Sequence, residues 1–135
     1  MLKRLFNHLG APLAGGSIPS WGAVDKKGFV YLTAWRDQIL RIDHGRRLAQ
    51  INWHSPGEGF SWKREERWDQ IEKLLEGNAG FIVLLEADDI MKRPRKIHRV
   101  ETHYIYQIGD VFASHAGSAA YAEMIKKVVT NFEGE

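Results

Sequence analysis

The chain has 135 residues, of which 44% are hydrophobic and 27% charged, and its formal net charge is +2. This length and composition are typical of one globular domain, and so small a net charge does not by itself indicate a partner. The absence of cysteine excludes disulfides, thiolate metal sites and cysteine nucleophiles. No apolar run reaches the roughly 18 residues of a membrane span, and no signal-peptide pattern is present. We therefore expect a cytoplasmic protein without a membrane partner.

A short helix and an arm are predicted for residues 1–20. Apolar residues in the stretch 1–9 recur at helical intervals, with Lys3 and Arg4 on the other side. Glycines and prolines in 10–20 are typical of a loop or extended arm. This segment could dock on its own domain, on a second copy of the chain or on a partner. Residues 21–135 are expected to form a single α+β domain.

Two strands are predicted early in that domain, at 21–24 and 28–35, with a turn between them. Alternate residues of the second strand would face opposite sides of a sheet. A polar turn at 43–46 follows. The strand expected after it, at 48–53, would pair in a hairpin with the segment that precedes the turn. Periodicity leaves open that residues 41–43 belong instead to a short helix that begins near residue 35.

A central helix and a buried strand are predicted in the middle of the chain. Ser61 is a candidate N-cap, and the apolar residues that follow, Trp68 among them, form one helix face from which Gln70 points away. Gly77 ends the helix because the left-handed position after a helix favours glycine. The continuous apolar run at 81–85 indicates a strand that is covered on both faces.

The last third of the chain is predicted to contain strands and a final helix. Strands are expected at 96–100 and 103–108, and a turn at Gly109-Asp110 leads to a short strand at 111–113. Apolar residues after Ser118 then fall at helical intervals: Tyr121, Met124, Ile125, Val128 and Phe132. This order favours an α+β fold with a mixed, strongly curved sheet or half-open barrel, carrying a central and a C-terminal helix.

Several sequence patterns carry a resemblance to known proteins: FNHLGAPL, WGAV with GFVYLTAWRDQ, EERWDQIEKLLEG, and FIVLLEADD with RPRKI. Together they resemble a family of small bacterial proteins with an NHLGAPL-type arm, a resemblance that covers nearly the whole chain and implies no activity. The order of elements is also similar to the PUA-like folds, which include the EVE and YTH domains. That similarity implies a half-open barrel and binding of RNA or modified bases in an aromatic-lined pocket.

Clustered cations near aromatic residues make nucleic-acid binding the leading hypothesis. Such cations neutralise phosphates and release counterions, and an exposed tryptophan can stack on a base or help to enclose a flipped one. The alternative is that the tryptophans are core residues and the charges form a solvated face. We expect a non-enzymatic module that binds DNA or RNA and reads an unpaired or modified base. The predicted nucleic-acid-binding residues are Trp53, Trp62, Arg41, Arg46, Arg47, Lys92, Arg93, Arg95, Lys96 and Arg99.

Two other functions are left open by the sequence. One is a protein-interaction or oligomerisation domain that forms a homodimer through the N-terminal arm. The other is a metal-dependent hydrolase that uses Glu86, Asp88 and a histidine, with His98, His103 and His54 able to approach one another. Neither a histidine spacing typical of metal ligands nor a phosphate-binding glycine loop is found. We therefore assign no catalytic residue, no metal site and no cofactor.

Overall fold

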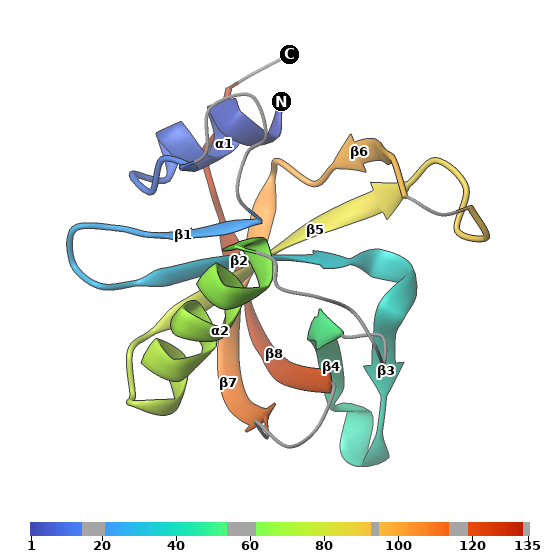
Figure 1. The fold of residues 1–135 in the computed structure, drawn as a ribbon. Coiled ribbons are helices and arrows are strands. Elements are labelled where there is room, and N and C mark those ends of the chain that lie inside the picture. The colour runs from blue at the N-terminus through green and yellow to red at the C-terminus, as the bar shows by residue number, and fades with distance from the viewer. Residues whose placement is uncertain (15–20, 54–61, 93–94, 114–118, 134–135) are drawn as a thin grey trace.

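The structure, a computed structural model, describes residues 1–14, 21–53, 62–92, 95–113 and 119–133. These residues form an eight-stranded mixed sheet and two α-helices, which confirms the predicted α+β class. The longer helix lies across one face of the sheet, and the shorter helix lies beside the chain termini (Figure 1). In chain order the elements are α1 (Leu2–His8), β1 (Gly22–Val24), β2 (Val30–Trp35), the 3₁₀ turn η1 (Arg36–Gln38), β3 (Ile39–Arg41), the 3₁₀ turn η2 (Asp43–Gly45), β4 (Arg47–Trp53), α2 (Trp62–Leu75), β5 (Gly80–Ala87), β6 (Ile97–Val100), β7 (Tyr104–Ala113) and β8 (Ala119–Val129).

The strand order in the sheet is β1-β2-β5-β7-β8-β4-β3, and β6 pairs with β5 off this path. Strands β2 and β5 run parallel, whereas the other pairs are antiparallel. The sheet bends strongly enough that β4 approaches β2, although the two are not neighbours in the strand order. No strand pairing joins β2 to β4 within the described ranges, so the curved sheet is not closed into a barrel.

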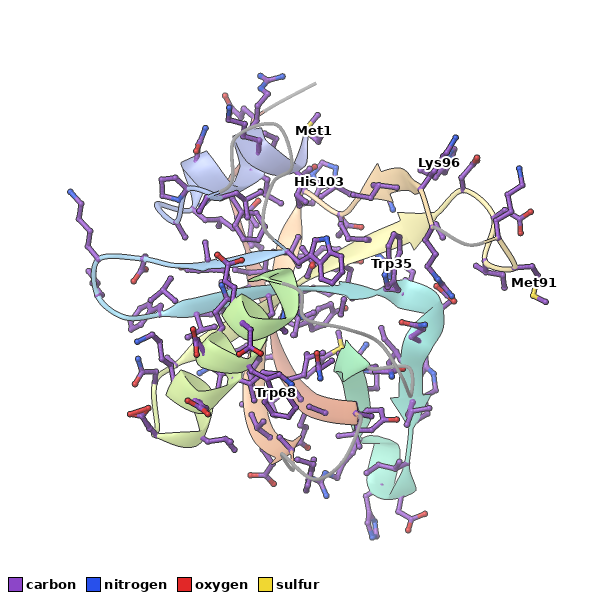
Figure 2. All side chains as sticks on the ribbon, viewed as in Figure 1. Met1, Trp35, Trp68, Met91, Lys96 and His103 are labelled. Atoms are coloured by element: carbon purple, nitrogen blue, oxygen red, sulfur yellow. The ribbon has the colours of Figure 1, made fainter. Side chains whose placement is uncertain are left out.

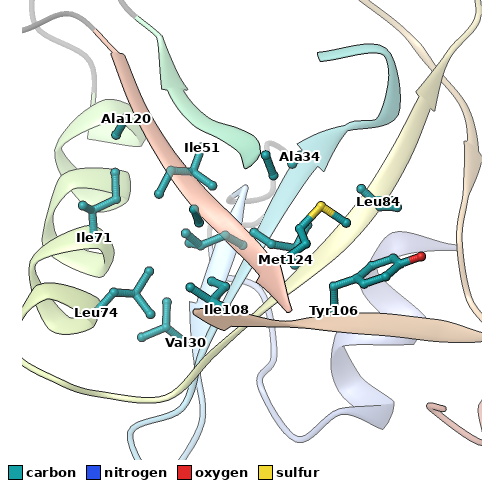
Figure 3. Close-up of a cluster of buried hydrophobic side chains, with 14 residues drawn as sticks. Val30, Ala34, Ile51, Ile71, Leu74, Leu84, Tyr106, Ile108, Ala120 and Met124 are labelled. Atoms are coloured by element: carbon teal, nitrogen blue, oxygen red, sulfur yellow. The ribbon is translucent and has the colours of Figure 1, made fainter. Parts of the chain in front are cut away.

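The main core lies between the sheet and α2 (Figure 3). Val30, Leu32 and Ala34 alternate along β2 and point into this core, where Ile71 and Leu74 approach from the helix. The helix presents one apolar face because these two residues lie three positions apart. The two-residue alternation predicted for β2 is therefore confirmed on this face.

The other face of the sheet is covered by α1. Tyr31 points to this side, and Leu5 and Phe6 of α1 are fully buried against it, with the rings of Phe6 and Tyr31 edge to face. His8 Nε2 donates a 2.7 Å hydrogen bond to the carbonyl oxygen of Thr130, which ties the segment after β8 to α1. The helix thus docks on its own sheet, while residues 15–20 of the arm lie outside the described residues. A homodimer through the arm stays a prediction.

The predicted C-terminal helix is wrong, because residues 119–129 form strand β8. Ala120, Ala122 and Met124 alternate into the core, and the residues between them are less buried. Alanines carry a weak hydrophobic signal, so the larger side chains at helical spacing outweighed this alternation in the sequence. The β-branched residues Val128 and Val129 also favour an extended backbone.

Three smaller predictions are settled by the backbone of the described residues. The hairpin of β3 and β4 is confirmed, and the alternative helix near residue 35 is reduced to the turn η1. Gly109-Asp110 is not a turn: it lies in a bulge of β7, whose end is the strand predicted at 111–113. A Cβ on Gly109 would come within 2.5 Å of Ile125 Cγ2, so glycine is needed for this close approach. The candidate cap Ser61 lies outside the described residues.

A buried arginine joins α2 to the open side of the sheet. Arg67 is 2% exposed, and its Nη1 donates to the carbonyl oxygens of Ile51 (2.6 Å) and Thr33 (3.2 Å). Its Nη2 donates to the carbonyl oxygen of Trp21 at 2.7 Å. A bulge leaves Ile51 out of the pairing of β4 with β8, so the guanidinium takes the place of a strand partner. Gln70, predicted to point away from the apolar face, is buried as well.

Candidate nucleic-acid interface

The parallel strands β2 and β5 end side by side at a cluster of four charged residues. Arg36 Nε lies 3.5 Å from Glu86 Oε2, and Arg36 Nη2 lies 3.3 Å from Glu101 Oε1. Arg99 Nη2 donates to Glu101 Oε1 at 3.1 Å, and its Nη1 donates to Glu86. Each carboxylate is therefore shared by two guanidinium groups, so the cluster has no net charge. The hydrogen bond from Arg99 holds the pKa of Glu86 below its ordinary value.

A second arginine–carboxylate contact anchors the segment that returns to β6. Arg95 makes a bidentate pair with Asp37 of η1, with N–O distances of 2.7 and 2.8 Å. Its guanidinium also lies over the ring of Trp35, 5.2 Å from the ring centroid. Because Trp35 ends β2 and Asp37 lies in the turn η1 that follows it, this contact fastens the β5–β6 hairpin to the sheet.

Beyond this anchor, the β5–β6 hairpin carries an exposed apolar tip and exposed cations. Figure 2 shows Met91 at the outer end of the loop, with Lys96 on its returning side. Met91 is 84% exposed, and Lys92, Lys96 and His98 are exposed as well. The acidic residues of the hairpin are engaged locally: Asp89 Oδ1 accepts the backbone N–H of Met91, and Asp88 Oδ1 lies 4.0 Å from His98 Nδ1.

The predicted arginines of the β3–β4 hairpin lie elsewhere. Figure 1 shows η2 well separated from the β5–β6 loop. Arg46 donates to Glu123 Oε2 at 2.8 Å and pairs with Asp110 at 3.2 Å. The guanidinium of Arg47 lies 4.8 Å from the ring centroid of Tyr106. These two arginines therefore contribute to the contact between the hairpin and strands β7 and β8.

The residues predicted to bind nucleic acid are thus not brought together as one surface. Arg46, Arg95 and Arg99 are paired with carboxylates. Arg41 is exposed on β3, the strand at one end of the sheet. Lys92 and Lys96 share the β5–β6 hairpin. Of the other predicted residues, Arg93 and the side chains of Trp53 and Trp62 lie outside the described part of the chain.

Sequence reasoning missed the partners that shape this region. Arg36 and Asp37 directly follow the apolar run of β2. Charged residues at the end of a buried strand were the sequence signal that could have identified them as ion-pair partners. Glu101 is 3% exposed and accepts hydrogen bonds from Arg36 and Arg99. No pattern connects Asp37 with Arg95, which lie 58 positions apart.

The metal-site residues considered from the sequence form no cluster in the described structure. No group of three or more histidine, aspartate and glutamate side chains that could hold a metal ion occurs within the described ranges. Glu86 accepts hydrogen bonding from Arg99 and lies beside Arg36, so its carboxylate is engaged in the charged cluster. His54 lies outside the described residues.

Comparisons with other proteins add no family to this description. No family model, curated protein sequence or solved structure matches the chain. Among the described residues, no helix combines the length and the apolar character that crossing a membrane requires.

Proposed function

We propose that the protein is a non-enzymatic nucleic-acid-binding module and that its β5–β6 hairpin contacts the phosphate backbone. The observation that carries this proposal is the hairpin itself, which projects from the sheet with Lys92 and Lys96 exposed on it. Phosphate binding depends on cations that reach the backbone of the nucleic acid. A projecting hairpin presents them without steric hindrance from the sheet.

The ion pairs at the base of the hairpin support this assignment. The carboxylates of Asp37, Glu86 and Glu101 would repel phosphate, but each is paired with an arginine. Arg95 and Arg99 are engaged in these pairs. The other charged residues of the hairpin, Lys92, Arg93 and Lys96 against Asp88 and Asp89, leave it with one excess positive charge above a base whose charges are balanced.

The reading of an unpaired or modified base, as in PUA-like domains, is the finer part of the proposal. The strongly curved mixed sheet supports it at the level of architecture. Trp53 and Trp62 are the residues proposed to contact the base. They lie at the end of β4 and the start of α2, two elements that contact each other.

Binding of labelled single- and double-stranded DNA and RNA across a salt series tests the proposal. The double variant K92Q/K96Q should reduce the slope of log K against log salt by about two, because each lysine that neutralises a phosphate contributes about one. The matched control is K26Q/K27Q, which removes two exposed lysines from the β1–β2 turn, at the opposite end of strands β2 and β5 from the hairpin loop (Figure 1). No binding of any probe at low salt, or an equal loss in both variants, would contradict the proposal.

A further inference from the structure

The tip of the β5–β6 hairpin exposes two apolar side chains to solvent. Met91 is 84% and Ile90 50% exposed, and Met91 is the most exposed large apolar residue in the described part of the chain. A large apolar side chain at the end of a projecting loop gains nothing from burial in the fold. Its exposure leaves this apolar group available to a binding partner.

The backbone of this tip is fixed from both sides. Asp89 Oδ1 accepts the N–H of Met91 at 2.9 Å, and the carbonyl oxygen of Asp89 accepts the N–H of Lys92 at 3.2 Å. Arg95 Nη2 donates to the carbonyl oxygen of Ile90 at 3.4 Å while its guanidinium is held by Asp37. These hydrogen bonds restrain the backbone from Asp89 to Lys92, which lowers the entropy cost of inserting it into a partner.

The small size of the tip selects among the partners that an apolar group could bind. A stable protein interface buries about 800 Å² on each side, and membrane anchoring through apolar contact also needs a broad face. Two side chains provide neither. Insertion between base pairs needs only one or two apolar side chains, because cations on the flanking phosphates supply most of the affinity.

We propose that Met91, supported by Ile90, inserts between base pairs of duplex DNA from the minor groove and bends the duplex. Lys92 and Lys96 then contact the phosphates on either side of the opened step. This inference rests on the proposed nucleic-acid binding and adds how the hairpin engages its ligand. The preferred sites are pyrimidine–purine steps such as TA, because these unstack at the lowest cost.

A duplex of about 30 base pairs, with a central TA step and a dye at each end, tests the inference. Energy transfer between the dyes reports bending, and 2-aminopurine at the central step reports unstacking. The wild-type protein should raise both signals, and a bend of about 20–90° is expected. Met91→Ala should abolish both signals, weaken binding about tenfold and leave the salt slope unchanged. The control Val129→Ala, which shortens an apolar residue that is 67% exposed on β8, should change nothing.

The outcomes separate the two proposals. If the wild type binds the duplex without bending it, or Met91→Ala bends it equally, insertion is refuted and nucleic-acid binding stands. If the wild type binds no nucleic acid, both proposals fail. Binding to vesicles that contain about 30% phosphatidylserine is measured as a last comparison. Binding to vesicles that requires Met91, without bending of DNA, would replace insertion into a duplex by contact with an anionic membrane.

Discussion

Replacing Arg67 by alanine tests whether a buried cation closes the open side of the sheet. The change removes the hydrogen bonds to Ile51 and Thr33 without providing another donor. The carbonyl oxygen of Trp21 keeps the hydroxyl and the N–H of Thr33 as donors. Two charge-assisted hydrogen bonds are worth about 3–6 kcal/mol together, and the two lost methylene groups add about 1.6 kcal/mol.

The substitution also removes the cost of burying a charged guanidinium, which offsets part of this loss. Burial lowers the pKa of Arg67 to about 10, so the side chain is still protonated at neutral pH. That drop corresponds to about 3 kcal/mol against the charged form, which alanine removes. We therefore expect Arg67→Ala to lower the free energy of unfolding by about 2–5 kcal/mol, a large share of the roughly 5–15 kcal/mol of a typical domain.

Urea unfolding followed by tryptophan fluorescence measures this difference, provided that the slope with urea is the same in both proteins. Lys73→Ala is the matched control, because Lys73 is an exposed cation on the same helix. Its effect should stay within about 0.5 kcal/mol. A loss below about 1 kcal/mol for Arg67→Ala would show that water or a rearranged backbone replaces the guanidinium, and the reasoning would be refuted.

Two further predictions concern pH and the N-terminal helix. Hydrogen bonds from Arg99 and Arg46 lower the pKa values of Glu86 and Glu123 from the ordinary 4.5. Their contribution to stability is therefore complete above pH 4.5 and is lost as the pH falls through the lower folded-state values. Urea unfolding at several pH values should show this decline, and Glu123→Gln should reduce it; an unchanged pH profile would contradict the assignment. Phe6→Ala should cost about 3–5 kcal/mol, measured by thermal unfolding, because the ring is fully buried. A dimer of the wild type that Phe6→Ala dissociates without loss of monomer stability would instead place α1 in an intermolecular contact.

The parts of the fold that the sequence predicted are those in which large apolar residues mark a buried face. In β2, Leu32 and Tyr31 go to opposite sides of the sheet, as their alternation indicates. In β8 the buried positions are filled by Ala120 and Ala122, so the pattern of large residues pointed to a helix. A sheet that curves tightly needs small residues inside, and small residues carry the weakest signal.

The candidate site was less predictable because it depends on pairings across the sheet. Arg95 and Arg99 were predicted as free phosphate ligands from their place in a basic segment. Their carboxylate partners Asp37, in the turn η1, and Glu86, on β5, lie 58 and 13 positions away and become neighbours only when the sheet forms. The residues that stay exposed, Lys92 and Lys96, were in the predicted set. What distinguishes them is the projection of the hairpin, which is a property of the fold.

The strand order has a consequence for how the chain folds as it is synthesised. Strand β4 pairs with β3, which precedes it closely in the sequence. Its other neighbour is β8, so Leu48 can pair with Glu123 only after β8 has been synthesised. The contact between His8 and Thr130 spans 122 positions. Contacts between residues so distant in sequence slow folding, because a long loop must be ordered before they form. While β8 is still inside the ribosome, one edge of β4 therefore stays unpaired, and α1 cannot contact Thr130 until that residue has also emerged.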